Sequence, residues 1–173
     1  MTERIHNFKQ SNIIGKTGEE IVLNWIRNRS NIRKITDVST IEKYRDEDID
    51  CILEFTDNKK KTGEIKTDTY LSGNIFYETV SNLEYGTLGC MEKSKADYLF
   101  YYFINSDELY IIDFPKYKKW FNENKHRFDC KKLKNKNKRE NGIYNSIGYT
   151  IPKVLFEREF NAYKKFKIQE MSA

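Results

Sequence analysis

The chain of 173 residues carries a net charge of +5; 33% of its residues are charged and 38% are hydrophobic. This composition excludes a disordered chain, and the length fits a single domain, residues 1–173, with its own core. No run of 18 apolar residues occurs, and the amino terminus has no apolar signal core. We therefore expect a cytoplasmic protein without membrane contact.

The cysteines give no metal or disulfide pattern. Cys51, Cys90 and Cys130 are widely spaced, and no Cys-x-x-Cys motif occurs. An odd number of cysteines without close pairs argues against structural zinc and against a disulfide framework.

The first predicted element is a helix from about Thr17 to Arg29, after a polar and flexible start at residues 1–12. Its apolar positions recur with a period near 3.6, at Ile21, Val22, Trp25 and Ile26. Glu19 lies on the same stripe and points partly inward. It is either a first-turn carboxylate that the helix dipole favours or a site residue.

Gly15-Lys16-Thr17 imitates the end of a phosphate-binding P-loop. The first glycine of that motif would fall at Gln10, so the motif fails and we expect no nucleotide cofactor.

A hairpin is predicted over residues 48–66, after a first strand near Ile32–Ser39. Two short apolar runs are joined by a polar turn. Asp50 directly precedes the first run, while Glu64 and Lys66 stand two apart on the second and share a face. Because antiparallel pairing brings the start of one strand to the end of the other, Asp50 should lie close to Glu64. Two convergent carboxylates are the ligands that Mg²⁺ or Mn²⁺ prefers.

Residues 46–50 hold four acids in five positions. They form either a solvated turn with mutually repelling carboxylates or a site in which a bound cation relieves that repulsion. Asp48 and Asp50 share a face, and Asp50 is preferred because it comes directly before the apolar run. Asp48 remains the alternative.

Further strands are predicted at Ile75–Val80, at the strongly apolar Ala96–Ile104 and at Leu109–Phe114, the last two as a second hairpin. Residues 82–95 are expected to form a loop with a short helix. A helix should follow from Pro115 to about Lys125.

The carboxyl-terminal third begins with a basic run, which predicts a mobile loop near residues 130–142. Its cations, suited to a sequence-independent grip on phosphates, are Lys131, Lys132, Lys134, Lys136, Lys138 and Arg139. A last strand or strand-loop at 147–156 and a closing helix at 157–169 complete the prediction.

The Asp before an apolar strand and the Glu-x-Lys 14 residues later resemble the PD-(D/E)XK nuclease superfamily, or restriction-endonuclease-like fold. The segment Gly73-Asn-Ile-Phe-Tyr-Glu78 after the motif is similar to phage-type nucleases of this superfamily, and Holliday junction resolvases are another similar group. The resemblance implies an α/β fold in which a mixed central sheet is flanked by helices.

The same resemblance implies a Mg²⁺- or Mn²⁺-dependent deoxyribonuclease of phage or bacterial intracellular type. Asp50 and Glu64 would hold the metal, and Lys66 would position the water. Glu19 would complete the site, and Glu20, one position later, is the alternative. Glu78 would help to orient the ligands without itself binding the metal.

Other activities of such a domain stay open. It could be a catalytically silent nucleic-acid-binding module or a module that inhibits another protein, or its substrate could be RNA rather than DNA. The resemblance also admits selectivity for junction or branched DNA, and a homodimer.

Overall fold

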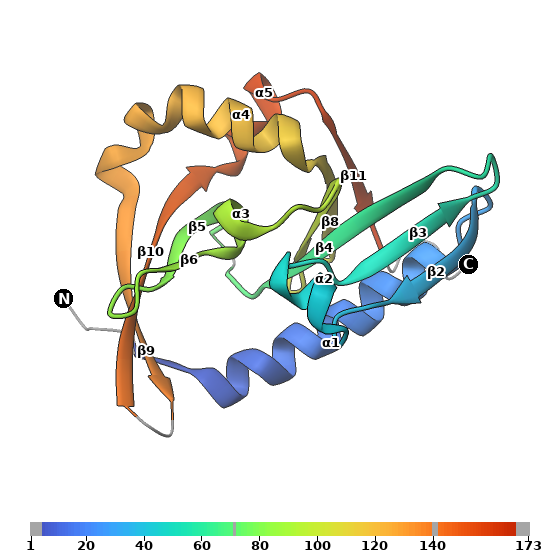
Figure 1. Ribbon diagram of the computed structural model, residues 1–173. Coiled ribbons are helices and arrows are strands. Elements are labelled where there is room, and N and C mark those ends of the chain that lie inside the picture. Colours follow the sequence, from blue (N-terminus) through green and yellow to red (C-terminus); the bar gives the residue numbers. More distant parts are fainter. Residues whose placement is uncertain (1–4, 71, 140–141, 169–173) are drawn as a thin grey trace.

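The computed structural model describes residues 5–70, 72–139 and 142–168; the side chains of residues 5–11, 129–131 and 139 are not described. Within these ranges the chain forms two β-sheets with helices around them (Figure 1). The mixed α/β architecture with a mixed sheet agrees with the prediction. None of the described helices has the length and apolar character needed to span a bilayer.

The six-stranded sheet carries the predicted hairpins. Its strand order is β11-β8-β7-β4-β3-β2. The strands are β2 (Ile32–Asp37), β3 (Cys51–Phe55), β4 (Lys60–Asp68), β7 (Tyr98–Phe103), β8 (Glu108–Asp113) and β11 (Tyr163–Lys167). β2, β3 and β4 are antiparallel, whereas β7 runs parallel to β4. β7 is central and almost wholly buried, which explains its continuous apolar run.

The long helix α1 (Phe8–Arg27) covers one face of this sheet. Its carboxyl-terminal half buries the predicted stripe, including Val22 and Ile26, against a core shared with β3, β4 and β7. The helix begins nine residues before the predicted Thr17, so the flexible start at residues 1–12 is corrected for residues 5–12. The early turns show no apolar stripe because Asn12 and Lys16 line a cleft instead of the core.

The five-stranded sheet has the order β1-β9-β10-β5-β6. Its strands are β1 (Ile5–Asn7), β5 (Asn74–Asn82), β6 (Thr87–Leu88), β9 (Lys132–Arg139) and β10 (Gly142–Pro152). The mobile basic loop predicted near 130–142 is therefore wrong where the chain is described, because the lysine run is a strand paired along its length with β10.

Short helices cover a second hydrophobic core, which includes Ile75, Tyr77 and Tyr110. They are α2 (Glu42–Asp46), α3 (Cys90–Lys93), α4 (Phe114–Asn124), the 3₁₀ helix η1 (Lys125–Lys131) and α5 (Lys153–Glu159). The helix expected from Pro115 is present as α4. It buries Tyr117 and Phe121, and the Phe121 ring stacks on Tyr77 of β5 with centroids 3.6 Å apart.

The closing helix predicted at 157–169 is wrong beyond residue 159. The chain leaves α5 and pairs as β11 with β8. Tyr163 contacts Tyr110, with ring centroids 5.7 Å apart, and Phe166 contacts Trp25 at 4.9 Å. The two aromatic side chains three residues apart thus serve two different cores, which a strand allows and one helix face does not.

Candidate metal and phosphate site

The end of β3 places Asp50 beside β4. Pairing between the two strands stops at Cys51 and Gly63, and the Asp50 N–H donates to the Gly63 carbonyl at 2.9 Å. Beyond this point no strand of the described residues pairs with the β3-facing edge of β4, and the Ile65 N–H donates to Asp50 Oδ2 at 2.7 Å. The Asp50 carboxylate thus replaces a strand and is fixed against β4.

Strand alternation sets the next group. Glu64, Lys66 and Asp68 project from one face of β4, while Ile65 enters the core on the other. Glu64 is only 8% exposed and shares a hydrogen bond with Asp50. Burial, followed by the neighbouring Asp50 charge, raises the pKa of Glu64 well above its usual range. Burial also raises the pKa of Asp50, although the Ile65 N–H opposes the shift.

Lys66 is the cation of the group. The pKa of its ammonium lies above the usual range because of the Cys90 sulfur, to which it is hydrogen-bonded, and of the Glu78 and Glu64 carboxylates. Burial raises the pKa of the Cys90 thiol to about 12, and the neighbouring Lys66 charge opposes this shift. Lys66 therefore remains charged with its ammonium held between β4, β5 and α3.

Glu19 reaches the same place from α1 because the helix packs very closely on β4. A Cβ added to Gly18 would lie 2.0 Å from Thr67 Oγ1, so only glycine allows this approach. Burial and then the Asp50 charge raise the pKa of Glu19 to about 7. The alternative, Glu20, is exposed on the helix and does not line the cleft.

Asp48 is directed elsewhere. Its carboxylate pairs with Lys93 at 3.0 Å, and its backbone carbonyl accepts from the Ser94 hydroxyl at 2.7 Å. With a φ of +45°, Asp48 turns the chain so that Asp50 rather than Asp48 faces the cleft. Of the two sequence alternatives, the geometry brings Asp50 together with Glu64.

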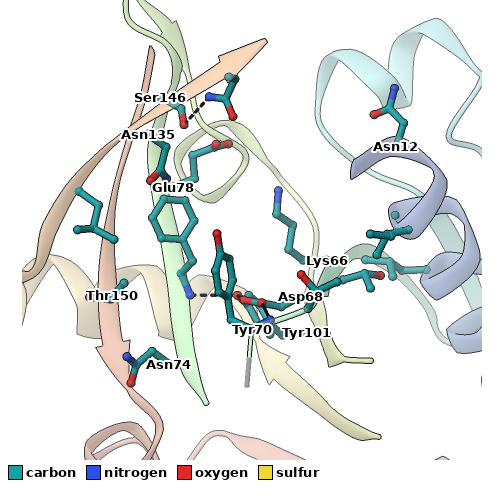
Figure 2. A pocket seen from close by; sticks show the side chains of 18 of the residues that line it. Asn12, Lys66, Asp68, Tyr70, Asn74, Glu78, Tyr101, Asn135, Ser146 and Thr150 are labelled. Atoms are coloured by element: carbon teal, nitrogen blue, oxygen red, sulfur yellow. Dashed lines mark hydrogen bonds between the residues drawn. The ribbon is translucent and has the colours of Figure 1, made fainter. Parts of the chain in front are cut away.

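Asp68 also lines the cleft, although sequence reasoning gave it no role. Its carboxylate accepts from the Tyr101 hydroxyl at 2.5 Å and from the Tyr70 N–H at 2.7 Å. The Tyr101 hydroxyl in turn accepts from the Phe76 N–H at 3.0 Å (Figure 2), which links β4 through β7 to β5. The signal was present in the sequence, because Asp68 continues the two-residue spacing of Glu64 and Lys66.

One cleft, with a volume of about 1260 Å³, is lined by Glu19, Asp50, Glu64, Lys66 and Asp68. Its walls are the acid-bearing face of β4, the amino-terminal half of α1, and one face of β5, β10 and β9. Figure 2 shows Lys66 and Asp68 facing Glu78, Asn135 and Ser146 across this space, with Asn12 of α1 on the far side. The predicted acids and lysine therefore meet in a single concavity.

The basic run contributes unevenly. Lys134 and Lys136 line the cleft, whereas the Lys132 ammonium lies over the Tyr149 ring, 5.8 Å from its centroid. Lys138 is exposed and does not line the cleft. The side chains of Lys131 and Arg139 lie outside the described residues. The six cations predicted to act together are thus divided.

The donor set suits a hard cation. Asp50 and Glu64 are buried beside each other, and burial raises the pKa of both; a divalent ion with oxygen ligands would neutralise both charges. No group of three or more His, Cys, Asp or Glu side chains in the described part of the chain has the spacing of a ready-made metal cage. Mg²⁺ is commonly held by one or two carboxylates with water and substrate oxygens, which two acids can supply.

Comparison with protein-family models, with curated proteins and with solved structures finds no match to this chain.

Proposed function

We propose that this protein is a divalent-metal-dependent deoxyribonuclease with the restriction-endonuclease-like fold of the PD-(D/E)XK superfamily. The observation that carries the proposal is the meeting of Asp50, Glu64 and Lys66 in one cleft. The three residues come from the end of one strand and one face of the next, as the Asp and Glu-x-Lys motif requires. The helix before an antiparallel strand trio, with a fourth strand parallel to the third, also supports the fold assignment.

In this proposal Asp50 and Glu64 hold the metal, and Glu19 completes or tunes the site. The bound ion would lower the pKa of a water ligand and offset negative charge on the phosphate. Asp50 and Glu64 must both be ionised to bind the metal ion. Glu19, with a pKa near 7, is suited to exchange a proton with solvent at neutral pH.

Lys66 provides a fixed positive charge beside the acids. Its ammonium donates to the attacking water or to a non-bridging phosphate oxygen, where negative charge grows as the reaction proceeds. The water oxygen forms a bond to phosphorus, and the water gives a proton to Glu19 or to solvent. The bond to the 3′-oxygen breaks, and that oxygen takes up a proton from solvent. The products are a 3′-hydroxyl and a 5′-phosphate. Glu78 keeps Lys66 charged and oriented from β5.

The test is cleavage of plasmid, linear, single-stranded and four-way-junction DNA, with Mg²⁺, with Mn²⁺ and with EDTA. Lys66→Ala should lower the cleavage rate by roughly 10²–10³-fold, the usual effect of removing a group that stabilises developing charge. Lys119→Ala is the matched control because Lys119 is an exposed lysine of α4. Equal behaviour of the wild type and Lys66→Ala on every substrate would reject the enzyme and leave a silent binding or inhibitory module. Cleavage of RNA alone would change the substrate class.

A further inference from the structure

The wall of the cleft opposite the acids has a different chemistry. Its side chains are mostly neutral, although Glu78, Lys134 and Lys136 are among them. The neutral side chains include Asn74, Phe76, Asn135, Asn137, Ser146 and Thr150. The acid wall, by contrast, carries several carboxylates and Lys66. The cleft therefore offers carboxylate chemistry on one side and mainly amide, hydroxyl and ring contacts on the other.

Strand register explains why these neutral groups gather. Asn135 pairs with Ser146 across β9 and β10, and Thr150 pairs with Phe76 across β10 and β5. Directly paired residues share a face, so three strands contribute to one surface. Asn135 and Asn137 share one face of β9 because they stand two residues apart, and Lys134 and Lys136 line the cleft beside them.

The polar wall is ordered. Asn137 Nδ2 donates to the buried Ser146 hydroxyl at 3.1 Å, which fixes the amide in the plane of the wall. The Phe76 ring packs on Gly148, where an added Cβ would lie 2.3 Å from the ring Cζ. Figure 2 shows Asn135, Ser146, Thr150 and Asn74 along this wall, with Lys66 across from them. The Asn137 amide and the Phe76 ring are thus held in place before any ligand arrives.

We infer that this wall receives the bases of an unpaired DNA strand whose phosphate lies at the acids and Lys66. The inference rests on the proposed nuclease function, because that function places the phosphate. Amides and hydroxyls match the hydrogen-bonding edges of bases, and an aromatic ring offers a stacking surface. Both are accessible only when the bases are not paired. The substrate class is therefore single-stranded DNA or the unpaired arm of a branched DNA.

A continuous duplex fits the same surface poorly. It would present phosphates to both walls, and duplex DNA carries about one negative charge per 1.7 Å of its axis. In a duplex the bases are paired and stacked, so the amides, hydroxyls and ring of this wall would have no base to contact, and only Lys134 and Lys136 would suit a phosphate. The wall therefore suits an unpaired stretch of DNA.

The experiment measures binding and cleavage separately. Fluorescence anisotropy of labelled single-stranded DNA, hairpin duplex DNA and matched RNA is recorded with the Lys66→Ala variant in EDTA, so that no cleavage occurs. We expect single-stranded DNA to bind at least about 10-fold more tightly than duplex. Asn135→Ala should weaken single-strand binding by roughly 10-fold, about the effect of one lost hydrogen bond, and leave duplex binding unchanged.

Asn135→Asp supplies a second variant of nearly the same shape, and its added charge should weaken binding further. Asn122→Ala and Asn122→Asp are the controls because Asn122 is exposed on α4. Equal or tighter binding of duplex, or no effect of either Asn135 variant in a protein with unchanged melting, would overturn the inference. Tighter binding of RNA would reassign the strand. Selective single-strand binding without metal-dependent cleavage by the wild type would reject the nuclease but keep the strand site.

Discussion

Replacing Glu64 by glutamine should make the metal-free protein more stable. Glu64 is buried beside Asp50, and its pKa is well above the unfolded value of 4.5. Between pH 4.5 and the folded pKa the folded state binds more protons than the unfolded state, so the stability of the wild type falls as pH rises through this window. Glutamine takes up no proton, and its amide can donate to Asp50 in place of the carboxyl proton.

The size of the effect follows from the pH difference. At pH 7 the group is 2.5 pH units above 4.5, and each unit is equivalent to about 1.4 kcal/mol, so the gain from Glu64→Gln is at most about 3 kcal/mol. We expect about 1–3 kcal/mol at pH 7 and almost none near pH 4.5. For a chain of this length that gain corresponds to a rise in Tm of roughly 3–10 °C.

The assay is urea unfolding followed by circular dichroism in EDTA at the two pH values. Glu123→Gln, an exposed substitution on α4, is the control and should change nothing. Added Mn²⁺ should stabilise the wild type and not Glu64→Gln, because the variant lacks a ligand. If Glu64→Gln is less stable than the wild type at pH 7 without metal, the buried charge of Glu64 does not destabilise the fold. The proposed metal site would then lose its electrostatic basis.

Three further outcomes test the surroundings of the site. Gly18→Ala should destabilise the protein by about 1–3 kcal/mol in the same urea assay and slow cleavage, because the new methyl group would push α1 and Glu19 away from Thr67. Ion pairs with two lysines lower the pKa of Glu108 to about 2 despite burial. Its contribution to the free energy of unfolding, about 3 kcal/mol, should therefore be present above pH 4.5 and disappear as pH falls toward 2. The stability of Glu108→Gln should lack this dependence on pH. Iodoacetamide at pH 8 should leave Cys51 and Cys90 unmodified in the native protein and label both in urea, as peptide mass spectrometry would show, because burial raises the pKa of both thiols.

The predictable part of the fold lies where hydrophobic patterning and burial coincide. The hairpin at β3 and β4, the apolar β7 and its partner β8 were all expected near their observed positions. Asp50 and Glu64 could be expected to approach each other because antiparallel register alone brings their positions together. The choice between Asp48 and Asp50 depends on the positive φ of Asp48 and on its ion pair with Lys93. No sequence pattern predicts either feature.

The basic run shows why the second sheet was missed. Lys132–Arg139 alternates with period two, but both alternating sets are mostly polar, since lysine faces one side and asparagine the other. Strands are usually found by an apolar face against polar positions, and this strand has little apolar face to reveal it. Asn135 and Asn137 line the cleft together with Lys134 and Lys136, so the residues that hide the strand from sequence analysis are those with which we propose it contacts DNA.

The two walls of the cleft come from different sheets, and their different roles explain why the two sheets differ in amino-acid composition. The acid wall depends on exact placement of few groups, and it is built on β4, which is paired with the buried β7 and capped by Asp50. The opposite wall needs many weaker contacts, and it is spread over three strands whose register alone orders them. Helix α1 contacts both β4 and β9, so it fixes the distance between the walls. A change of the asparagine wall should therefore alter which strand is bound while the chemistry at Glu64 and Lys66 is retained, and a change at Gly18 should affect both.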